Sequence, residues 1–100
     1  MLPADWESNP EQLVGFAGWC LQNDLNLDEA ERLADKAAPL SAPGKPRASA
    51  LNTKGQIQFK RGQVTDAVKS LEAALAELPG NPYLTQQLAQ FKAALPNGGQ

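Results

Sequence analysis

Apolar residues recur at intervals of three and four along almost the whole of this 100-residue chain. Side chains at that spacing share one face of an α-helix, whereas a half-buried strand needs alternation at every second residue. Runs that contain Pro or Gly interrupt the pattern at 41–46, 62 and 79–80. These residues end helices because Pro lacks a backbone N–H and Gly readily adopts left-handed conformations. The sequence therefore predicts an all-α fold.

The interruptions divide the chain into five expected helices. Asn9 is the expected N-cap of the first, with Pro10 at the first helical position and Gln12 as a capping-box partner. Asn26 begins the second in the same way, with Glu29 three residues later. We expect helices at 10–23, 27–40, 47–61, 64–78 and 81–95, an N-terminal flank at 1–8 and a flexible tail at 96–100.

Composition excludes most kinds of catalytic site. The chain has no His and a single Cys, so it cannot form a His-based triad, a His general base or an ordinary zinc site. Cys20 lies within the apolar arc of the first helix, and we expect a buried, inert thiol there. We therefore expect no enzymatic activity, no cofactor and no metal.

No stretch approaches the roughly 20 apolar residues that cross a bilayer. Residues 1–10 also lack the basic start and apolar run of a signal peptide. We expect a soluble protein, with the cytoplasm favoured as its compartment.

The two halves of the chain differ in charge. Residues 1–44 carry two basic and eight acidic side chains, whereas residues 45–100 carry seven basic and three acidic ones. The basic residues are too dispersed for a nucleic-acid surface, on which dense Lys and Arg neutralise phosphates. Nucleic acid is therefore not an expected partner.

Three of the basic residues stand seven apart and form one stripe along the third expected helix. They are Arg47, Lys54 and Arg61. The stripe could meet an acidic partner, but we favour ion pairs across the repeat junction with carboxylates of the second helix, namely Asp28, Glu31 or Asp35.

The chain also repeats itself at an interval of 37 residues. The shift aligns Val14 with Leu51, Gly18 with Gly55, Ala30 with Ala67 and Ala37 with Ala74. Small residues let the two helices of a hairpin approach closely, because no bulky side chain separates their backbones. The sequence therefore predicts two helix-turn-helix repeats, at 10–40 and 47–79, and a capping helix at 81–95.

In their spacing these residues resemble the tetratricopeptide repeat, whose pattern places Leu-Gly in the first helix, Ala in the second and a closing Pro. Repeat two keeps Leu51, Gly55, Ala67, Leu71, Ala74 and Pro79, and repeat one keeps Val14, Gly18, Leu21, Ala30, Ala34 and Ala37. Lys54 replaces a usual Leu and Gln58 a usual aromatic, and the period exceeds the usual 34 residues. The resemblance covers 9–95, and the segment 25–37 is similar to bacterial tandem repeats of this family.

The resemblance implies a short right-handed α-solenoid of two repeats plus a C-terminal capping helix. In this family the first helix of each pair lines a concave groove for a partner's peptide or helix. Carried over position by position, the groove-lining residues are Gln12, Gly15, Trp19, Gln22, Asn23, Ser49, Asn52, Gln56, Phe59 and Lys60, continued on the cap by Tyr83, Gln86 and Gln90. The cluster of Lys, Arg and Asn with which some members hold C-terminal carboxylates is absent.

Trp19 lies roughly 120° from the centre of the apolar arc of its helix. Trp is a frequent anchor of interfaces, so we expect Trp19 and Phe59 to hold an extended segment. Asn52, Gln56 and Gln90 would supply hydrogen bonds. The alternative, weighed equally, is that the N-terminal segment or a neighbouring helix covers Trp19.

Three functions remain open from the sequence. The leading one is a non-enzymatic protein-protein interaction module. The second is a structural self-association unit such as a homodimer, because two repeats are fewer than the three or so that solenoids usually need for stability. The third is a repeat appendage of a larger enzyme.

Overall fold

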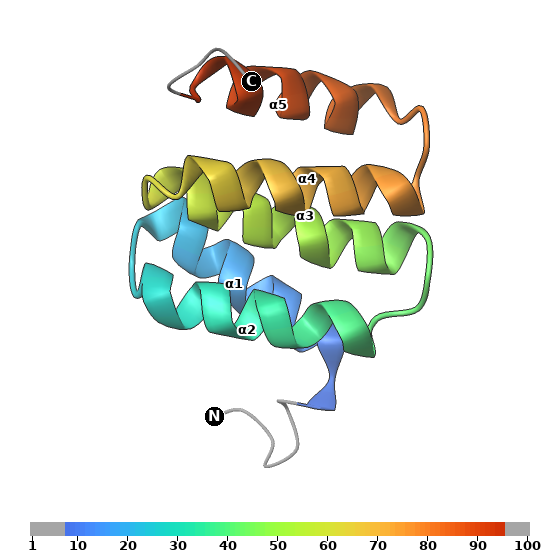
Figure 1. Cartoon of the computed structure of the whole chain (residues 1–100). Coiled ribbons are helices and arrows are strands. Elements are labelled where there is room, and N and C mark those ends of the chain that lie inside the picture. Colours follow the sequence, from blue (N-terminus) through green and yellow to red (C-terminus); the bar gives the residue numbers. More distant parts are fainter. Residues whose placement is uncertain (1–7, 96–100) are drawn as a thin grey trace.

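Five helices make up the structure, a computed structural model that describes residues 8–95 (Figure 1). They are α1 (Pro10–Asn23), α2 (Leu27–Leu40), α3 (Lys45–Lys60), α4 (Val64–Glu77) and α5 (Pro82–Ala93). The described residues contain no strand, so the predicted all-α fold is confirmed. The flank at 1–7 and the tail at 96–100 lie outside the described residues. No described helix is long and apolar enough to cross a membrane.

Asn side chains cap two of the helices, and the cap at Asn9 was predicted. Asn9 Oδ1 accepts hydrogen bonds from the backbone N–H groups of Glu11 at 3.0 Å and Gln12 at 3.3 Å. Asn81 Oδ1 accepts one from Leu84 N at 3.0 Å. Each cap satisfies N–H groups that have no partner within the helix. These two caps fix where α1 and α5 begin.

The predicted capping box at Asn26 is wrong. Asn26 has left-handed backbone angles, φ 50° and ψ 46°, and its side chain makes no cap hydrogen bond. Side-chain capping needs an extended residue whose oxygen points at the first turn. Glu29 instead binds Arg32 through two hydrogen bonds of 2.8 Å, and this pair lowers the pKa of Glu29.

Helix α3 begins two residues earlier than predicted. Pro46 lies inside its first turn, where the missing proline N–H would have had no partner in any case. Gly44 precedes the helix with a φ of 90°, which glycine adopts without a steric cost. The extra residues bring Lys45 and Pro46 into α3. At the other end of the chain, α5 stops at Ala93, before the predicted 95.

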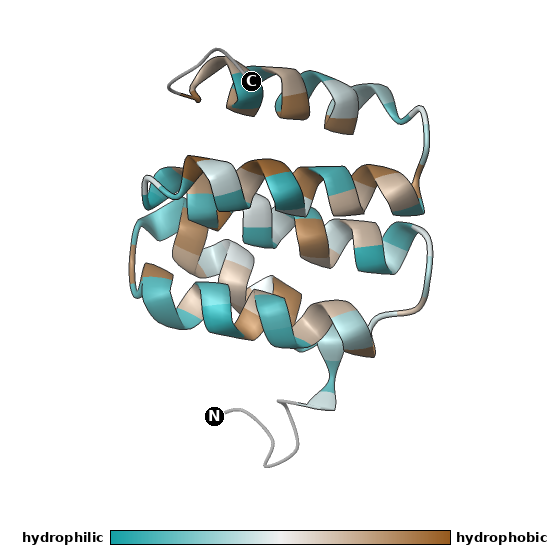
Figure 2. Cartoon of the chain, in the orientation of Figure 1, coloured by the Kyte–Doolittle hydropathy of each residue, from teal (hydrophilic) through white to brown (hydrophobic). Residues whose placement is uncertain are grey.

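Consecutive helices pack against each other, and α1 also contacts α3. Figure 1 places α2 and α4 in front, α1 and α3 behind them, and α5 across the upper end. Figure 2 shows hydrophilic bands on the outward faces of α2 and α4. The interior is a chain of apolar clusters, and Leu51 packs against both the cluster of α3, α4 and α5 and the cluster that includes Leu13 and Leu33.

The backbones of α3 and α4 approach closely at Gly55. A Cβ on Gly55 would overlap Leu71 Cδ2 and would lie 3.3 Å from Ser70 Cβ and 3.4 Å from Ala67 O. Leu71 is fully buried, so it has no free space into which to move. The prediction that a small residue permits close packing is confirmed here.

The same prediction is wrong for Gly18. No atom outside its own helix backbone lies within 4 Å of the position that a Cβ would take. The 37-residue shift explains the difference, because it places Ala34 of α2 where Leu71 stands in α4. A smaller side chain therefore stands at the position equivalent to Leu71.

Two members of the basic stripe bind α2 across the repeat junction. Lys54 Nζ lies 2.6 Å from Asp35 Oδ1, and Arg61 Nη1 lies 2.6 Å from Glu31 Oε1. Glu31 also accepts a hydrogen bond from the buried Gln58, whose Oε1 accepts one from Ser70. The prediction that the basic stripe forms ion pairs with carboxylates of α2 is therefore confirmed for Lys54 and Arg61.

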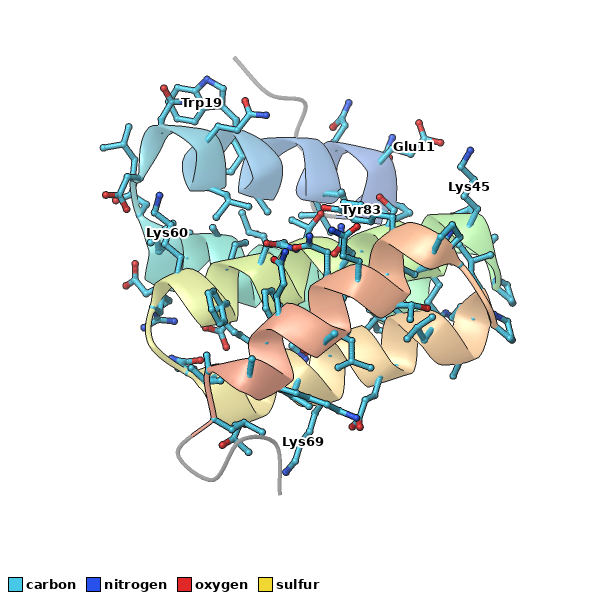
Figure 3. The ribbon with its side chains drawn as sticks, turned by 90° about the horizontal axis from the view of Figure 1, so that it is seen from above. Glu11, Trp19, Lys45, Lys60, Lys69 and Tyr83 are labelled. Atoms are coloured by element: carbon cyan, nitrogen blue, oxygen red, sulfur yellow. The ribbon has the colours of Figure 1, made fainter. Side chains whose placement is uncertain are left out.

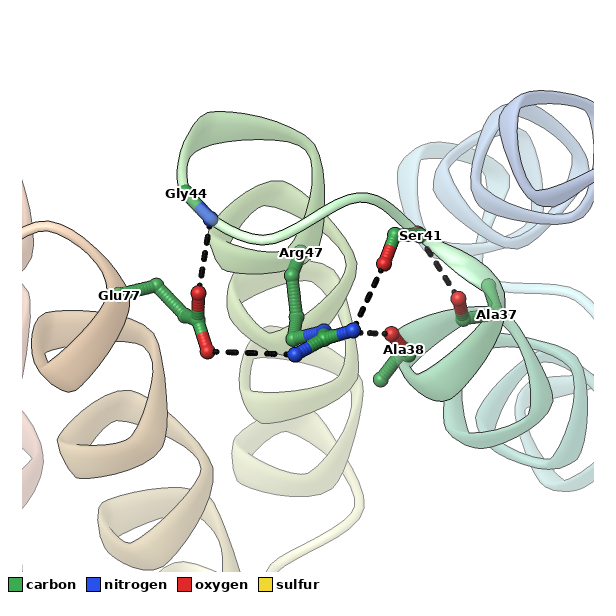
Figure 4. Close-up of polar contacts among 6 residues, drawn as sticks. All are labelled: Ala37, Ala38, Ser41, Gly44, Arg47 and Glu77. Atoms are coloured by element: carbon green, nitrogen blue, oxygen red, sulfur yellow. Dashed lines mark hydrogen bonds and ion pairs between the residues drawn. The ribbon is translucent and has the colours of Figure 1, made fainter.

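Arg47, the third member of the stripe, has different partners and fixes the turn between α2 and α3 (Figure 4). Its guanidinium donates to Ala38 O at 3.2 Å and to Ser41 O at 3.0 Å, and lies 3.7 Å from Glu77 Oε2. Glu77 Oε1 also accepts from Gly44 N at 2.7 Å. Pairing of Arg47 with an α2 carboxylate was therefore a wrong expectation, because α3 begins early enough to place Arg47 beside the carbonyls that end α2.

Matched glycine substitutions test the close packing at Gly55. Gly55→Ala is expected to lower the free energy of unfolding by about 1–3 kcal/mol, because the new methyl overlaps a buried side chain. Gly18→Ala is expected to be neutral or to stabilise by up to about 1 kcal/mol, since alanine favours helix and nothing obstructs it. Urea denaturation followed by circular dichroism measures both, and equal destabilisation would contradict this packing.

Substitutions of Glu77 test the turn. Glu77→Ala removes both the acceptor for Gly44 N–H and the charge beside Arg47, and is expected to cost about 1–2 kcal/mol of stability. Glu77→Gln keeps an acceptor and is expected to cost less. Glu72→Ala is the control, because its exposed contact with Lys92 at 3.8 Å is worth at most about 0.5 kcal/mol. Thermal unfolding ranks the stabilities of the three variants. If Glu77→Ala destabilises the protein no more than Glu72→Ala does, Glu77 does not stabilise the turn between α2 and α3.

Candidate functional site

The predicted site residues all lie on α1, α3 and α5, the first helix of each expected pair and the cap. The larger hollow on these helices has a volume of about 490 Å³. It is lined by Pro10, Glu11, Val14 and Gly15 of α1, by Ser41 and Ala42 of the turn, and by Pro46 and Ser49 of α3. Most of this lining is apolar carbon, and the only charged side chain in it is Glu11. The hollow is therefore suited to an apolar side chain.

A second hollow of about 200 Å³ lies between the first turns of α3 and α5. Its lining comprises Lys45, Ala48, Ser49 and Asn52 of α3, Leu78 and Asn81 of the turn between α4 and α5, and Tyr83 and Leu84 of α5. Ser49 belongs to both hollows, so they adjoin along α3. We call these two hollows on α1, α3 and α5 together the hollowed face.

The linings of the two hollows correspond in part under the sequence repeat. A shift of 37 residues carries four lining residues of the first onto four of the second: Glu11 to Ala48, Gly15 to Asn52, Ser41 to Leu78 and Pro46 to Tyr83. Each hollow lies beside a turn of the form Pro-Gly-x-Pro, at 43–46 and 79–82. The repeated backbone therefore makes a repeated recess, while the side chains differ between the two.

Amide side chains continue the hollowed face from α3 to α5. Gln56 Nε2 donates to Gln87 Oε1 at 2.9 Å and to Asn52 Oδ1 at 3.3 Å. This arrangement brings together the predicted residues Asn52 and Gln56. Gln87 was missed by the sequence analysis, although its position three after Leu84 and four before Phe91 puts it on the inward side of α5.

Phe59 is not a free aromatic anchor. Its ring stacks on Phe91 of α5, with centroids 4.2 Å apart and an interplanar angle of 6°. Phe59 is half-buried and packs against the cluster of α3, α4 and α5. The stack attaches α5 to α3, and the expectation that Phe59 also contacts a partner stays a prediction.

Trp19 is 53% exposed, so no described helix covers it. Its ring centroid lies 6.3 Å from that of Phe16, and its carbonyl accepts a hydrogen bond from Asn23 Nδ2 at 2.8 Å. Figure 3 places Trp19 and Lys60 at one end of the molecule, Glu11 and Lys45 at the other, and Tyr83 between them. Trp19 is therefore separate from the two hollows, which lie at the Glu11 end of α1.

The remaining predicted residues are on the surface. Those with exposed side chains are Gln12, Gln22, Asn23, Lys60, Tyr83, Gln86 and Gln90. Among them only Tyr83, which is 53% exposed, lines a hollow. Most of the other hollow-lining residues were missed, and the signal that could have found them is the recurring Pro-Gly-x-Pro.

Other polar side chains form contacts with one another within the protein. A charged recess between α2 and α3 is lined by Asp28, Glu31, Arg32, Asp35, Lys54, Gln58 and Arg61, most of them paired with one another. Cys20 is fully buried, as predicted, and burial together with the charge of Glu29 raises the pKa of its thiol. Within residues 8–95, no group of three or more His, Cys, Asp or Glu side chains could hold a metal ion.

Comparisons of the chain with protein-family models, with curated proteins and with solved structures find no match. The resemblance to the tetratricopeptide repeat therefore stays a prediction from the residues.

Two aromatic substitutions separate a structural ring from a surface ring. Phe59→Ala is expected to cost about 2–3 kcal/mol and to lower the hydrogen-exchange protection of α5, because the Phe91 stack is lost. Trp19→Ala is expected to cost less than about 1 kcal/mol, since more than half of the side chain is already exposed. Hydrogen exchange measured by NMR gives both results. Unchanged protection of α5 in Phe59→Ala would contradict its assigned role.

Proposed function

We propose that this chain is a non-enzymatic protein-interaction module that binds an extended peptide segment of a partner protein along the hollowed face. The observation that carries the proposal is the recurrence of one recess at the 37-residue repeat. We further propose the arrangement that the sequence resemblance implies, a short right-handed α-solenoid of two tetratricopeptide-like repeats with α5 as its cap.

A repeated recess suits an extended ligand. A peptide in β conformation presents every second side chain on the same side, so it offers side chains at a regular spacing to successive hollows. The larger hollow has the volume and apolar lining to take a Leu, Ile or Phe side chain. Ser49 lies between the two hollows, where a peptide backbone would cross α3.

The amides beside the hollows support the same occupant. A bound extended segment has backbone N–H and C=O groups that lose water and need partners. Asn52 Nδ2 donates to no described residue, while the Oδ1 of the same amide is already held by Gln56. Asn52 is thus oriented by its neighbour and has donor capacity left for a ligand.

Selection from a library of random dodecapeptides displayed on phage tests the proposal, with the purified chain as bait. Gly15→Leu is the blocking variant, because no atom obstructs a side chain at Gly15 and leucine there would fill the larger hollow. Ala76→Leu is the matched control, since it adds the same side chain at an exposed position of α4 outside both hollows. Selected peptides are expected to bind the control as they bind the native chain, and to bind Gly15→Leu at least roughly tenfold more weakly.

The same variants distinguish binding of a partner peptide from self-association of the chain. Peptides that bind all three proteins equally, or a failure to enrich any peptide, would contradict the proposed use of the hollowed face. A dimer detected by sedimentation that is lost in Gly15→Leu alone would assign the face to a second copy of the chain instead.

A further inference from the structure

We propose that the smaller hollow binds the carboxylate of an Asp or Glu side chain in the partner segment, while the adjoining larger hollow takes an apolar side chain. This inference rests on the proposed function. It names the chemistry of the ligand, an acidic residue close in sequence to a bulky apolar one.

The polar groups of the smaller hollow are mainly hydrogen-bond donors. Lys45, Ser49, Asn52 and Tyr83 contribute an ammonium, a hydroxyl, an amide and a phenol, and no Asp or Glu lines this hollow. Among residues 8–95, Lys45 Nζ has no ion-pair partner and Tyr83 OH has no hydrogen-bond partner. A carboxylate accepts several such bonds at once, and bonds to a charged group are the stronger kind.

The backbone adds positive potential at the same place. The hollow is bounded by the first turns of α3 and α5, helices of 16 and 12 residues, and the N-terminal end of a helix carries partial positive charge. Lys45 stands in the first turn of α3, where the helix dipole disfavours a cation. A bound anion would relieve this unfavourable placement.

Lys45 forms no ion pair with any residue among 8–95. Glu77, on the same side of the turn, is already held by Gly44 N–H and lies beside Arg47. Arg47 in turn is bonded to the carbonyls of Ala38 and Ser41. The charge of Lys45 therefore remains available to a ligand.

The larger hollow has the opposite preference. Glu11 is its charged lining residue, and the equivalent position in the smaller hollow is the uncharged Ala48. Gly15 and Pro46 of the larger hollow likewise correspond to the polar Asn52 and Tyr83. A carboxylate would be repelled by Glu11 and attracted by Lys45, so the two hollows distinguish acidic from apolar side chains and set the direction of the peptide.

Capped synthetic peptides test this inference. Two pools of decapeptides, N-acetylated and C-amidated, carry one Leu in a Ser/Gly background and, one to four residues away, either Glu or the isosteric Gln. Binding is followed on the amide signals of the protein by NMR titration. The Glu pool is expected to bind roughly threefold to tenfold more tightly than the Gln pool, a preference that weakens as salt is added.

Matched lysine variants locate the effect. Lys45→Gln is expected to abolish the preference for Glu, and Tyr83→Phe to reduce it. Lys69→Gln removes the same charge from an exposed residue far from Lys45 in Figure 3, and is expected to keep the preference. Loss of the preference in Lys69→Gln as well would overturn the inference.

The remaining outcomes separate this inference from the function on which it rests. Equal binding of both pools would overturn the carboxylate site while leaving peptide binding intact. A third pool carries Gln and a free C-terminal carboxylate. If it binds more tightly than the capped Glu pool, the smaller hollow binds a terminal carboxylate and not the side-chain carboxylate that we propose. Binding of no pool would count against the proposed function itself.

Discussion

The close approach of α3 and α4 at Gly55 is the contact on which the rest of the structure depends. With no side chain at Gly55, the fully buried Leu71 packs directly over the α3 backbone. Helix α3 is thereby fixed at the centre, where it contacts α2 and α1 on one side and binds α5 through the Phe59 and Phe91 rings on the other. The hollowed face has α3 as its shared wall, so its shape follows from this placement.

The turn between α2 and α3 determines what the hollowed face presents. Arg47 and Glu77 hold this turn, and the early start of α3 brings Pro46 into the larger hollow and Lys45 into the smaller one. The sequence repeat makes the two recesses alike in backbone, while differences between corresponding residues give one an apolar and the other a donor-rich lining. Similar shape with different chemistry is what a binding surface needs in order to distinguish neighbouring side chains of one peptide.

The sequence predicts the local structure well because the signals are local. Helical spacing, the Asn caps and the Pro-Gly turns define the five helices to within a few residues, and Gly55 was recognised as a close contact. The errors depend on tertiary neighbours. Gly18 looked equivalent to Gly55, but nothing lies within 4 Å of its Cβ position, and the repeat has Ala34 where Leu71 stands in α4. The stacking of Phe59 on Phe91 was not predicted, because it joins residues of two different helices. The two hollows were not predicted either, because their linings include residues of the turns between helices.

The most direct test of the central claim is a set of intermolecular nuclear Overhauser effects between the isotope-labelled protein and an unlabelled peptide selected against it. The account predicts contacts from the peptide to Val14 and Pro46 in the larger hollow and to Tyr83 and Leu84 in the smaller one. A peptide that shows contacts only to the outward faces of α2 and α4, with none to these four residues, would contradict the hollowed face as the binding site.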